Sequence, residues 1–214
     1  LEYYYEPAGL CSASVFLQEI RDLIFTSDGG YTASGAGNGF NGNYAGYRLR
    51  TQTNGGYARV RGLELNFQHR FSWLPGFWSG FGLFANHTWL ESVGDFGTIG
   101  RTRTQAQVPG FVPRTASFGI SFINQKWTIR TLTTYRGANP QVIGADPLAQ
   151  EFNRSRIPTD FNASYTINPK YTVFLNVANV FASDLNGSYL YHTLKTINKD
   201  GWQQHIKFGL SGRM

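Results

Sequence analysis

Arginine is the residue type in this sequence with the most capacity for binding chemistry. The chain of 214 residues has fourteen Arg against five Lys, with a formal net charge of +6. A guanidinium group binds carboxylate or phosphate oxygens through two parallel hydrogen bonds, and tyrosine adds an aromatic face and a hydroxyl. The positive charge permits three interpretations, a nucleic-acid partner, a basic lumen or contact with anionic lipid.

Catalysis finds little support in the sequence. The four histidines, His69, His87, His192 and His205, lie far apart, and the 13 acidic residues are scattered. No Ser/His/Asp, paired-carboxylate or HExxH spacing occurs, and the single cysteine, Cys11, cannot build a zinc motif. We expect no enzyme activity, no catalytic residues, no cofactor and no metal site.

The segments that carry these side chains are predicted to be β-strands. In 114–123, the residues Ala116, Phe118, Ile120 and Phe122 alternate with small polar residues. Such a period of two, repeated in segment after segment, is typical of strands with one apolar face. Nine strands are expected, at about 1–6, 10–27, 45–73, 80–94, 113–124, 126–138, 156–168, 170–183 and 201–213.

The connections alternate between short turns and long polar loops. Short turns are expected near residues 6–9, 73–76, 124–126 and 168–170, and long loops near 27–44, 95–112, 138–155 and 183–201. A soluble β-sandwich has no reason to sort its connections by length, whereas an outer-membrane barrel has short periplasmic turns and longer extracellular loops. The fold class predicted is all-β, an antiparallel transmembrane β-barrel.

Aromatic residues occur at two levels along the predicted strands. They flank the short turns and recur eight to ten residues further along, close to the length of a tilted spanning strand. Two girdles at the membrane interfaces are expected. Their members are Trp73, Trp78, Trp127 and Tyr171 near the short turns, and Trp89, Tyr135 and Phe181 near the long loops.

The alternation assigns side chains to the lumen or to the outer mouth of such a barrel. Lumen-facing residues are expected to be Glu64, Asn66, Gln68, Arg70, Arg130, His205 and Lys207. Candidate ligand-binding residues at the mouth are Arg136, Arg154, Arg156, Tyr189 and Tyr191. Arginine and tyrosine suit an anionic chelate, but sugars and cobalamin also bind aromatics, so the ligand class stays open. Most aromatics alternate away from the basic face, which argues against a nucleic-acid partner.

Arg59 and Arg61 permit two interpretations. Read without interruption, they share the face of Leu63, Leu65 and Phe67, where a midplane arginine would cost ~2–4 kcal/mol. At the edge of the apolar band they could instead reach lipid phosphates. A bulge at Gly62 would turn both inward, and it is preferred because glycine is the usual bulge residue. His69, also on the apolar stripe, is the least expected residue there.

Five motifs, in order and spacing, carry a resemblance to a known family. They are "EYYYEPAGLCSASVFLQEIRDLI", "NGGYARVRGLELNFQHRFSWLPG", "GLFANHTWLES", "VPRTASFGISF" and "LNVANVF". The chain resembles the C-terminal half of TonB-dependent outer-membrane receptors over nearly its whole length. It departs from the family's terminal aromatic residue, since it ends in "KFGLSGRM".

The resemblance implies a 22-stranded barrel with an N-terminal plug, in the bacterial outer membrane. Residues 1–214 would be its C-terminal strands 14–22, without the plug and earlier strands. The only methionine is Met214, so we expect a fragment or processed product. The family implies import of a scarce nutrient such as a ferric siderophore, cobalamin or saccharide.

The same resemblance implies particular partners. They are a small-molecule ligand, outer-membrane lipid and lipopolysaccharide, the missing plug and strands, and the TonB complex acting through the plug. A plug-less porin or adhesin-type barrel and a soluble β-sandwich binding module are the alternatives.

Overall fold

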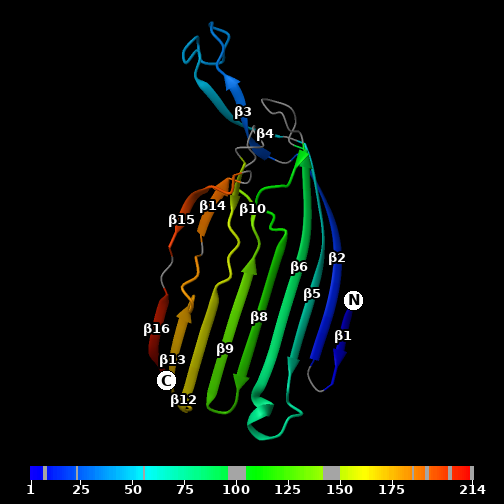
Figure 1. Ribbon diagram of the computed structural model, residues 1–214, viewed down its shortest axis with the longest axis vertical. Helices are drawn as coiled ribbons and strands as arrows, with labels where there is room; N and C mark the ends of the chain where they lie inside the picture. The colour runs from blue at the N-terminus through cyan, green and yellow to red at the C-terminus, as the bar shows by residue number, and fades with distance from the viewer. Residues whose placement is uncertain are drawn as a thin grey trace.

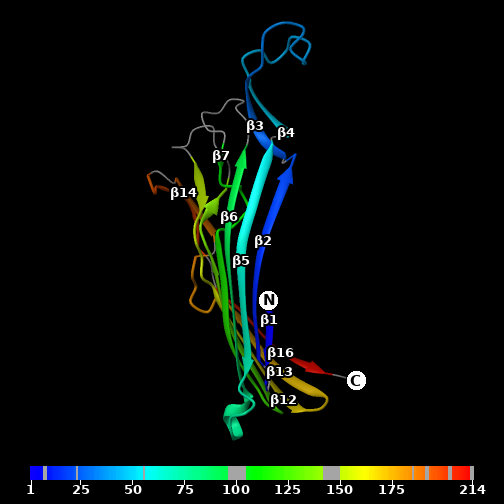
Figure 2. The same cartoon turned by 90° about the vertical axis from the view of Figure 1, so that its right-hand side faces the viewer.

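Nine strands form one antiparallel sheet in which each strand pairs with the next of the nine along the chain. The computed structural model describes residues 1–6, 9–22, 24–54, 56–95, 105–141, 150–184, 186–190, 193–201 and 204–212. The sheet curves across its width, and the two chain ends lie at its opposite edges (Figures 1 and 2). Its strands, in spatial order, are β1 (Glu2–Tyr5), β2 (Gly9–Arg21), β5 (Tyr57–Arg70), β6 (Phe81–Asp95), β8 (Arg114–Ile123), β9 (Trp127–Arg136), β12 (Thr159–Asn168), β13 (Tyr171–Ala178) and β16 (His205–Gly212).

The nine strands expected from the alternation are confirmed, with corrections at their ends. The expected strand 10–27 breaks after Arg21, because Asp22 adopts a left-handed φ of 56°. The expected strand 45–73 breaks before β5, where Gly56 has a φ of 113°. The expected strand 170–183 ends at Ala178, because Asn179 has a φ of 53°. Residues in the left-handed region cannot continue a β-ladder.

Further strands lie at one end of the large sheet. β3 (Ile24–Tyr31) begins within the expected strand 10–27 and β4 (Arg48–Asn54) lies within the expected strand 45–73, but the two form a separate hairpin that projects beyond the sheet (Figure 1). A four-stranded sheet joins β10 (Asn139–Pro140), β11 (Glu151–Asn153), β14 (Asn186–Leu190) and β15 (Thr196–Asp200) at the same end, and β7 (Gln105–Ala106) pairs with β6. We call this the long-loop end and the other the short-turn end.

Asparagine side chains build two turns at the short-turn end. The Asn124 Oδ1 accepts hydrogen bonds from the backbone N–H groups of Lys126 and Trp127, at 2.9 and 2.7 Å. Asn168 repeats this arrangement with the N–H groups of Lys170 and Tyr171. Such hydrogen bonds from an asparagine side chain to the backbone mimic a backbone turn and keep the connection short. The β5–β6 connection instead contains a 3₁₀ helix, η1 (Gly76–Gly80).

Register divides the large sheet into an apolar face and a polar face. Residues directly opposite each other in an antiparallel pair share a face. One row runs through Cys11, Phe67, Ala85 and Phe118, and the next runs through Ser12, Asn66, Asn86 and Ser117. At the other edge, Leu175 pairs with Phe208 while Asn176 pairs with Lys207. Between these two regions, one row runs through Phe122, Ile129, Ala163 and Leu175 and the next through Ser121, Arg130, Asn162 and Asn176, so the two faces persist from β2 to β16.

The chain has little conventional core. In the part that the structure describes, one buried apolar cluster consists of Ala58, Ala106 and Val108, with Ile20 and Phe111 packed against it. Apolar side chains of the large sheet stay exposed instead, including Phe208, at 81% of its full accessibility. No described helix is long and apolar enough to cross a membrane. The expected alternative of a β-sandwich is wrong, because the architecture is a single large antiparallel sheet rather than two stacked ones.

Aromatic rings on the polar face lie over glycines of the neighbouring strand. Phe16 covers Gly62, Phe84 covers Gly119, and Phe174 covers Gly209, each pair directly opposite in register. A β-carbon at any of these glycines would overlap the ring. Glycine is therefore required here by the close approach of a ring rather than by backbone conformation, an arrangement that helps a sheet to curve.

Gly119→Ala is predicted to destabilise the sheet, because its methyl group would collide with the ring of Phe84 and with the backbone of Thr131. The expected cost is about 1–3 kcal/mol, typical of overpacking. Thermal unfolding of the detergent-solubilised protein, followed by circular dichroism, measures it. Gly201→Ala is the matched control, since nothing lies within 4 Å of its new methyl group. Equal unfolding midpoints for the two variants would contradict the packing described.

Candidate functional site

A hollow on the polar face lies toward the short-turn end of β2, β5 and β6. This lower cavity has a volume of about 670 Å³ and includes Asn66, Gln68, Arg70 and Arg130 in its lining. The Asn66 Nδ2 donates to the Ser12 Oγ at 3.2 Å across the strands. The two guanidinium groups give this polar cavity a positive charge at pH 7.

Each residue expected to face the lumen lies on the polar face. Glu64 is in register with Ser14 and Thr88, and Arg130 with Asn162. His205 is opposite Ala178, and Lys207 is opposite Asn176.

A second hollow lies at the long-loop end of β9, β12 and β13. This mouth pocket has a volume of about 550 Å³, and its polar lining includes Arg136, Arg156, Asp160 and His205. Arg136 and Arg156 are brought together by a bridge in which each N–H donates to the other's carbonyl at 2.9 Å. The Asp160 carboxylate accepts the Asn179 N–H at 2.9 Å, which fixes it at the pocket wall. Two guanidinium groups beside one carboxylate favour an anionic guest.

A smaller cluster lies in the four-stranded sheet of the long loops. The Arg154 guanidinium carbon lies 5.8 Å from the centre of the Tyr189 ring, and its Nη2 donates to the Thr196 hydroxyl. Phe152 packs beside Tyr189, with ring centres 6.1 Å apart. A cation over an aromatic face is attracted by the ring's quadrupole, so Arg154 and Tyr189 hold each other in place.

The residues expected at the mouth thus fall into two groups. Arg136 and Arg156 line the mouth pocket, and Arg154 and Tyr189 form the loop cluster, while Tyr191 lies outside the described residues. Sequence reasoning did not select Asp160, Phe152 or Thr196 as site residues. The alternation already placed Asp160 on the polar face, but Phe152 and Thr196 lie in the short strands β11 and β15, within connections where the sequence shows no period to select them.

The aromatic residues expected in the girdles are found near the two ends of the sheet. Trp73, Trp78, Trp127 and Tyr171 are exposed at the short-turn end. Toward the long-loop end, Trp89 and Phe181 are exposed and Tyr135 is half-buried.

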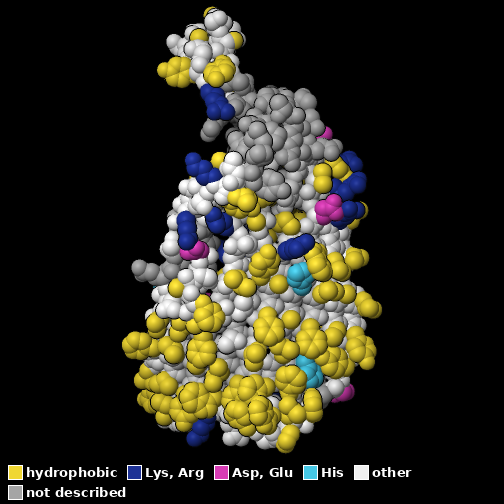
Figure 3. Space-filling view, in the orientation of Figure 1, with side chains coloured by type: hydrophobic (Ala, Val, Ile, Leu, Met, Phe, Trp, Pro, Cys, Tyr) yellow, Lys and Arg dark blue, Asp and Glu magenta, His cyan; other side chains and the backbone are white. Residues whose placement is uncertain are grey.

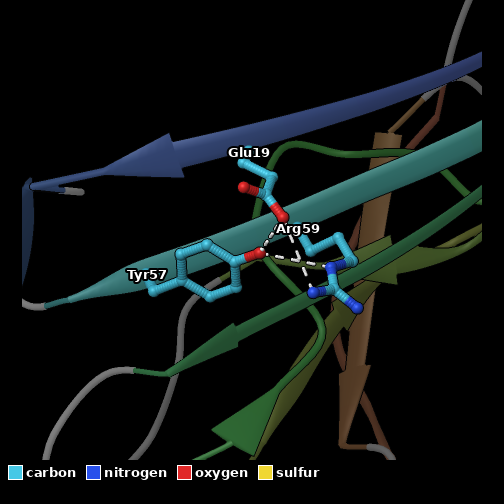
Figure 4. Close-up of polar contacts among 3 residues, drawn as sticks. All are labelled: Glu19, Tyr57 and Arg59. Atoms are coloured by element: carbon cyan, nitrogen blue, oxygen red, sulfur yellow. Dashed lines mark hydrogen bonds and ion pairs between the residues drawn. The ribbon is translucent and has the colours of Figure 1, made fainter.

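Arg59 and Arg61 lie on the apolar face, and the preferred bulge at Gly62 is wrong. The β2–β5 and β5–β6 registers run through Gly62 without a break. Gly62 instead gives room to the Phe16 ring. Arg61 is paired with Glu91 at 2.7 Å, and Arg59 with Glu19 at 3.5 Å. Figure 4 shows the Tyr57 hydroxyl donating to Glu19 and accepting from Arg59.

His69 is accommodated on the apolar face by an aromatic surround. Its ring stacks on Tyr5 at 5.4 Å and meets Phe71 edge-on at 4.9 Å. The Trp73 indole N–H donates to the His69 Nε2 at 3.3 Å. Among the described residues, no group of three or more His, Cys, Asp or Glu is placed to hold a metal ion.

Comparison with known proteins gives one family and several similar structures. Residues 1–180 match the family model described as "TonB dependent receptor-like, beta-barrel". No curated protein sequence matches the chain. The chain is similar in fold to the copper transporter OprC, with a TM-score of 0.62 and 14% identity, covering 99% of this chain and 30% of that one.

Two further structures show the same fold. One is the ferric enterobactin receptor PfeA of Pseudomonas aeruginosa, as a G324V mutant, with a TM-score of 0.62, 14% identity and coverage of 99% of this chain and 29% of that one. The other is the ferric-catecholate import receptor Fiu of E. coli K12, with a TM-score of 0.57, 14% identity and coverage of 98% and 26%. The chain spans less than a third of the length of these proteins.

Tyr189→Ala is predicted to loosen the loop cluster, and Tyr189→Phe to preserve it, because only the first removes the ring under Arg154. The pairing contributes about 0.5–1 kcal/mol at an exposed site, which corresponds to roughly two- to fivefold faster exchange. The amide of Arg154, bonded to the Gly187 carbonyl at 2.8 Å, reports it by hydrogen exchange. If Tyr189→Phe raised the exchange rate of the Arg154 amide as much as Tyr189→Ala does, the aromatic ring would not be what holds this cluster.

Proposed function

The chain belongs to the TonB-dependent receptor-like β-barrel family, and on that premise we propose that it is part of an outer-membrane receptor that imports a scarce nutrient. Residues 1–214 would supply strands 14–22 of a 22-stranded barrel, whose plug and earlier strands lie outside this chain. The protein would lie in the bacterial outer membrane, surrounded by lipid and lipopolysaccharide. The family is one of transport receptors rather than enzymes.

The observation that carries the proposal is the separation of the two faces. On the apolar face of β16, the relative accessibilities of Ile206, Phe208 and Leu210 are 63, 81 and 62%. Each such side chain in water would forfeit about 1.5–3 kcal/mol of burial free energy. Contact with lipid recovers that energy, and the exposed aromatic residues at both ends then lie at the two interfaces.

The polar face would border the lumen. The lower cavity, with Arg70 and Arg130, is suited to acidic or carbonyl groups of the plug. The plug in turn would transmit the action of the TonB complex. Glu64, Asn66, Gln68, His205 and Lys207 would hydrate the lumen or contact the plug.

The ligand proposed is an anionic metal chelate. The paired arginines of the mouth pocket and the nearby aromatic cluster offer charge and stacking surface for a flat, negatively charged complex. Similar structures include receptors named for ferric enterobactin and for ferric catecholates, and one named as a copper transporter. Cobalamin or a saccharide would depend on the aromatic residues and much less on the arginines.

Arg136→Gln combined with Arg156→Gln is predicted to weaken binding of ferric enterobactin by the full-length receptor at least tenfold. Each hydrogen bond to a charged group contributes about 1.5–3 kcal/mol. The loss of two such bonds therefore exceeds the ~1.4 kcal/mol that corresponds to a tenfold change in affinity. Titration of the purified receptor measures the affinity, and uptake of the labelled chelate by cells measures transport. Lys126→Gln with Lys170→Gln, at the short-turn end, is the control with the same loss of charge.

Two results would contradict the proposal. Unchanged affinity in the arginine double variant would exclude this pocket as the anion site. Uptake that continues in cells without TonB would favour a plug-less porin.

A further inference from the structure

A groove on the apolar face lies near the long-loop end of β2, β5 and β6. This upper groove has a volume of about 780 Å³, and its lining includes Leu17, Arg59, Arg61, Trp89 and Glu91. Figure 3 shows acidic and basic side chains gathered above the broad hydrophobic area of this face. The broad hydrophobic area thus has a cluster of acidic and basic side chains along its border toward the long-loop end.

The acidic residues hold the arginines without using up their hydrogen-bonding capacity. The Arg61 Nε and Nη2 both contact the same Glu91 oxygen, at 2.8 and 2.7 Å. A guanidinium group has five N–H donors, so its outer edge remains available. The side chain of Arg61 is 64% exposed and that of Arg59 is 55% exposed. Each carboxylate therefore positions a guanidinium group whose outer edge stays open to solvent.

A third arginine lies on the same face with no such partner. Arg114 is directly opposite Trp89 in the β6–β8 register, so it points to the apolar face. It is exposed, and its side chain makes no ion pair or hydrogen bond within the part of the chain that the structure describes. Arg59, Arg61 and Arg114 outnumber Glu19 and Glu91, which leaves one net positive charge.

Arg61 lies at the height expected of lipid headgroups. Ten residues separate it from Phe71, at the short-turn end. With a rise of about 3.4 Å per residue and a tilt of about 40°, these residues span about 26 Å, close to the ~25 Å apolar band of an outer-membrane barrel. The Arg61 guanidinium group then lies just beyond the hydrocarbon, where anionic groups are available to bind it. Arg114 lies in the row of Leu63 and Trp89, two residues below that of Arg61 and Glu91, and its long side chain can extend toward the same layer.

A second groove continues below the first on the same three strands. This lower groove has a volume of about 380 Å³, and its lining includes Cys11, Ala13, Leu65, Phe67 and Ala85. In register, it occupies the rows immediately beneath that of Val15, Leu63 and Trp89. A charged groove over an apolar one, aligned along the strands, matches an amphiphile with its headgroup toward the long loops.

We propose that the upper and lower grooves form a binding site for one phosphorylated acyl lipid of the outer leaflet, of the lipid A type. Arg59 and Arg61 of the upper groove, with Arg114 on the neighbouring strand β8, bind the phosphate oxygens, and the lower groove takes an acyl chain. The two separate guanidinium positions favour a lipid with two phosphates, because each can pair bidentately with one. The inference rests on the proposed function, since it requires this face to meet lipid.

The experiment uses the full-length receptor, purified in detergent and stripped of lipid. Lipid A with two phosphates is added, and binding is measured by native mass spectrometry, with one-phosphate lipid A as the comparison probe. The variants are Arg61→Gln with Arg114→Gln, the charge-conserving Arg61→Lys with Arg114→Lys, and Lys126→Gln with Lys170→Gln as the control. Ala13→Phe, which fills the lower groove, tests the acyl-chain half of the site separately.

The glutamine pair is expected to lower the affinity for two-phosphate lipid A at least tenfold, and the lysine pair to fall between it and the unaltered receptor. The control should bind normally, and Ala13→Phe should lower the affinity for both lipids. Native affinity in the glutamine pair would overturn the inference, as would an unaltered receptor that does not distinguish the two lipids. A receptor absent from the outer-membrane fraction would instead overturn the proposed function, so the two failures are distinguishable.

Discussion

Backbone hydrogen bonding is the constraint on which the rest of this structure depends. Hydrocarbon offers no partner to a peptide N–H or C=O group, so a strand in a membrane must bond laterally to its neighbours. From β2 to β16 the long strands do so in register, and that leaves only the side chains to define each face. Because side chains alternate with a period of two, one strand can present Leu65 and Phe67 to lipid and Asn66 to a polar interior. The proposed lumen, mouth pocket and lipid site all follow from that alternation.

Polar residues on the apolar face show how strict the constraint is. His69 lies near the short-turn end, surrounded by Tyr5, Phe71 and Trp73 and bonded to the indole N–H. Arg59 and Arg61 lie near the other end, each paired with a glutamate. Near the interfaces, water and headgroups reduce the cost of a charge that would be ~2–4 kcal/mol at the midplane. The positions of His69, Arg59 and Arg61 agree with a bilayer between the two aromatic levels, whereas His87, opposite Leu65, lies between those levels and packs against Trp89 with ring centres 4.3 Å apart.

The sequence predicted the nine long strands and their order because alternation and turn residues are local signals. It placed β3 and β4 at the ends of longer strands rather than in a hairpin of their own, and it did not predict β7, β10, β11, β14 or β15, since strands of two to five residues are too short to show a period. The bulge predicted at Gly62 was wrong, because a glycine that forms a bulge and a glycine that makes room for a ring such as Phe16 cannot be told apart from the sequence. For the mouth pocket, the alternation predicted that Arg136 and Arg156 lie on two different strands, but only the structure shows that the two residues pair across a β-bridge. Phe152 and Thr196 lie in the short strands β11 and β15, whose sequences show no period that could have identified them.

The central claim is that the two faces of the large sheet meet different solvents, and β5 tests it most directly. Single cysteines at positions 63 to 68, in a Cys11→Ala background, can carry spin labels in the membrane-embedded receptor. Their collision rates with oxygen, which is enriched in lipid, and with a polar nickel complex are then compared. We predict high oxygen access at 63, 65 and 67 and high nickel access at 64, 66 and 68. Nickel access that is equally high at all six positions would contradict the account.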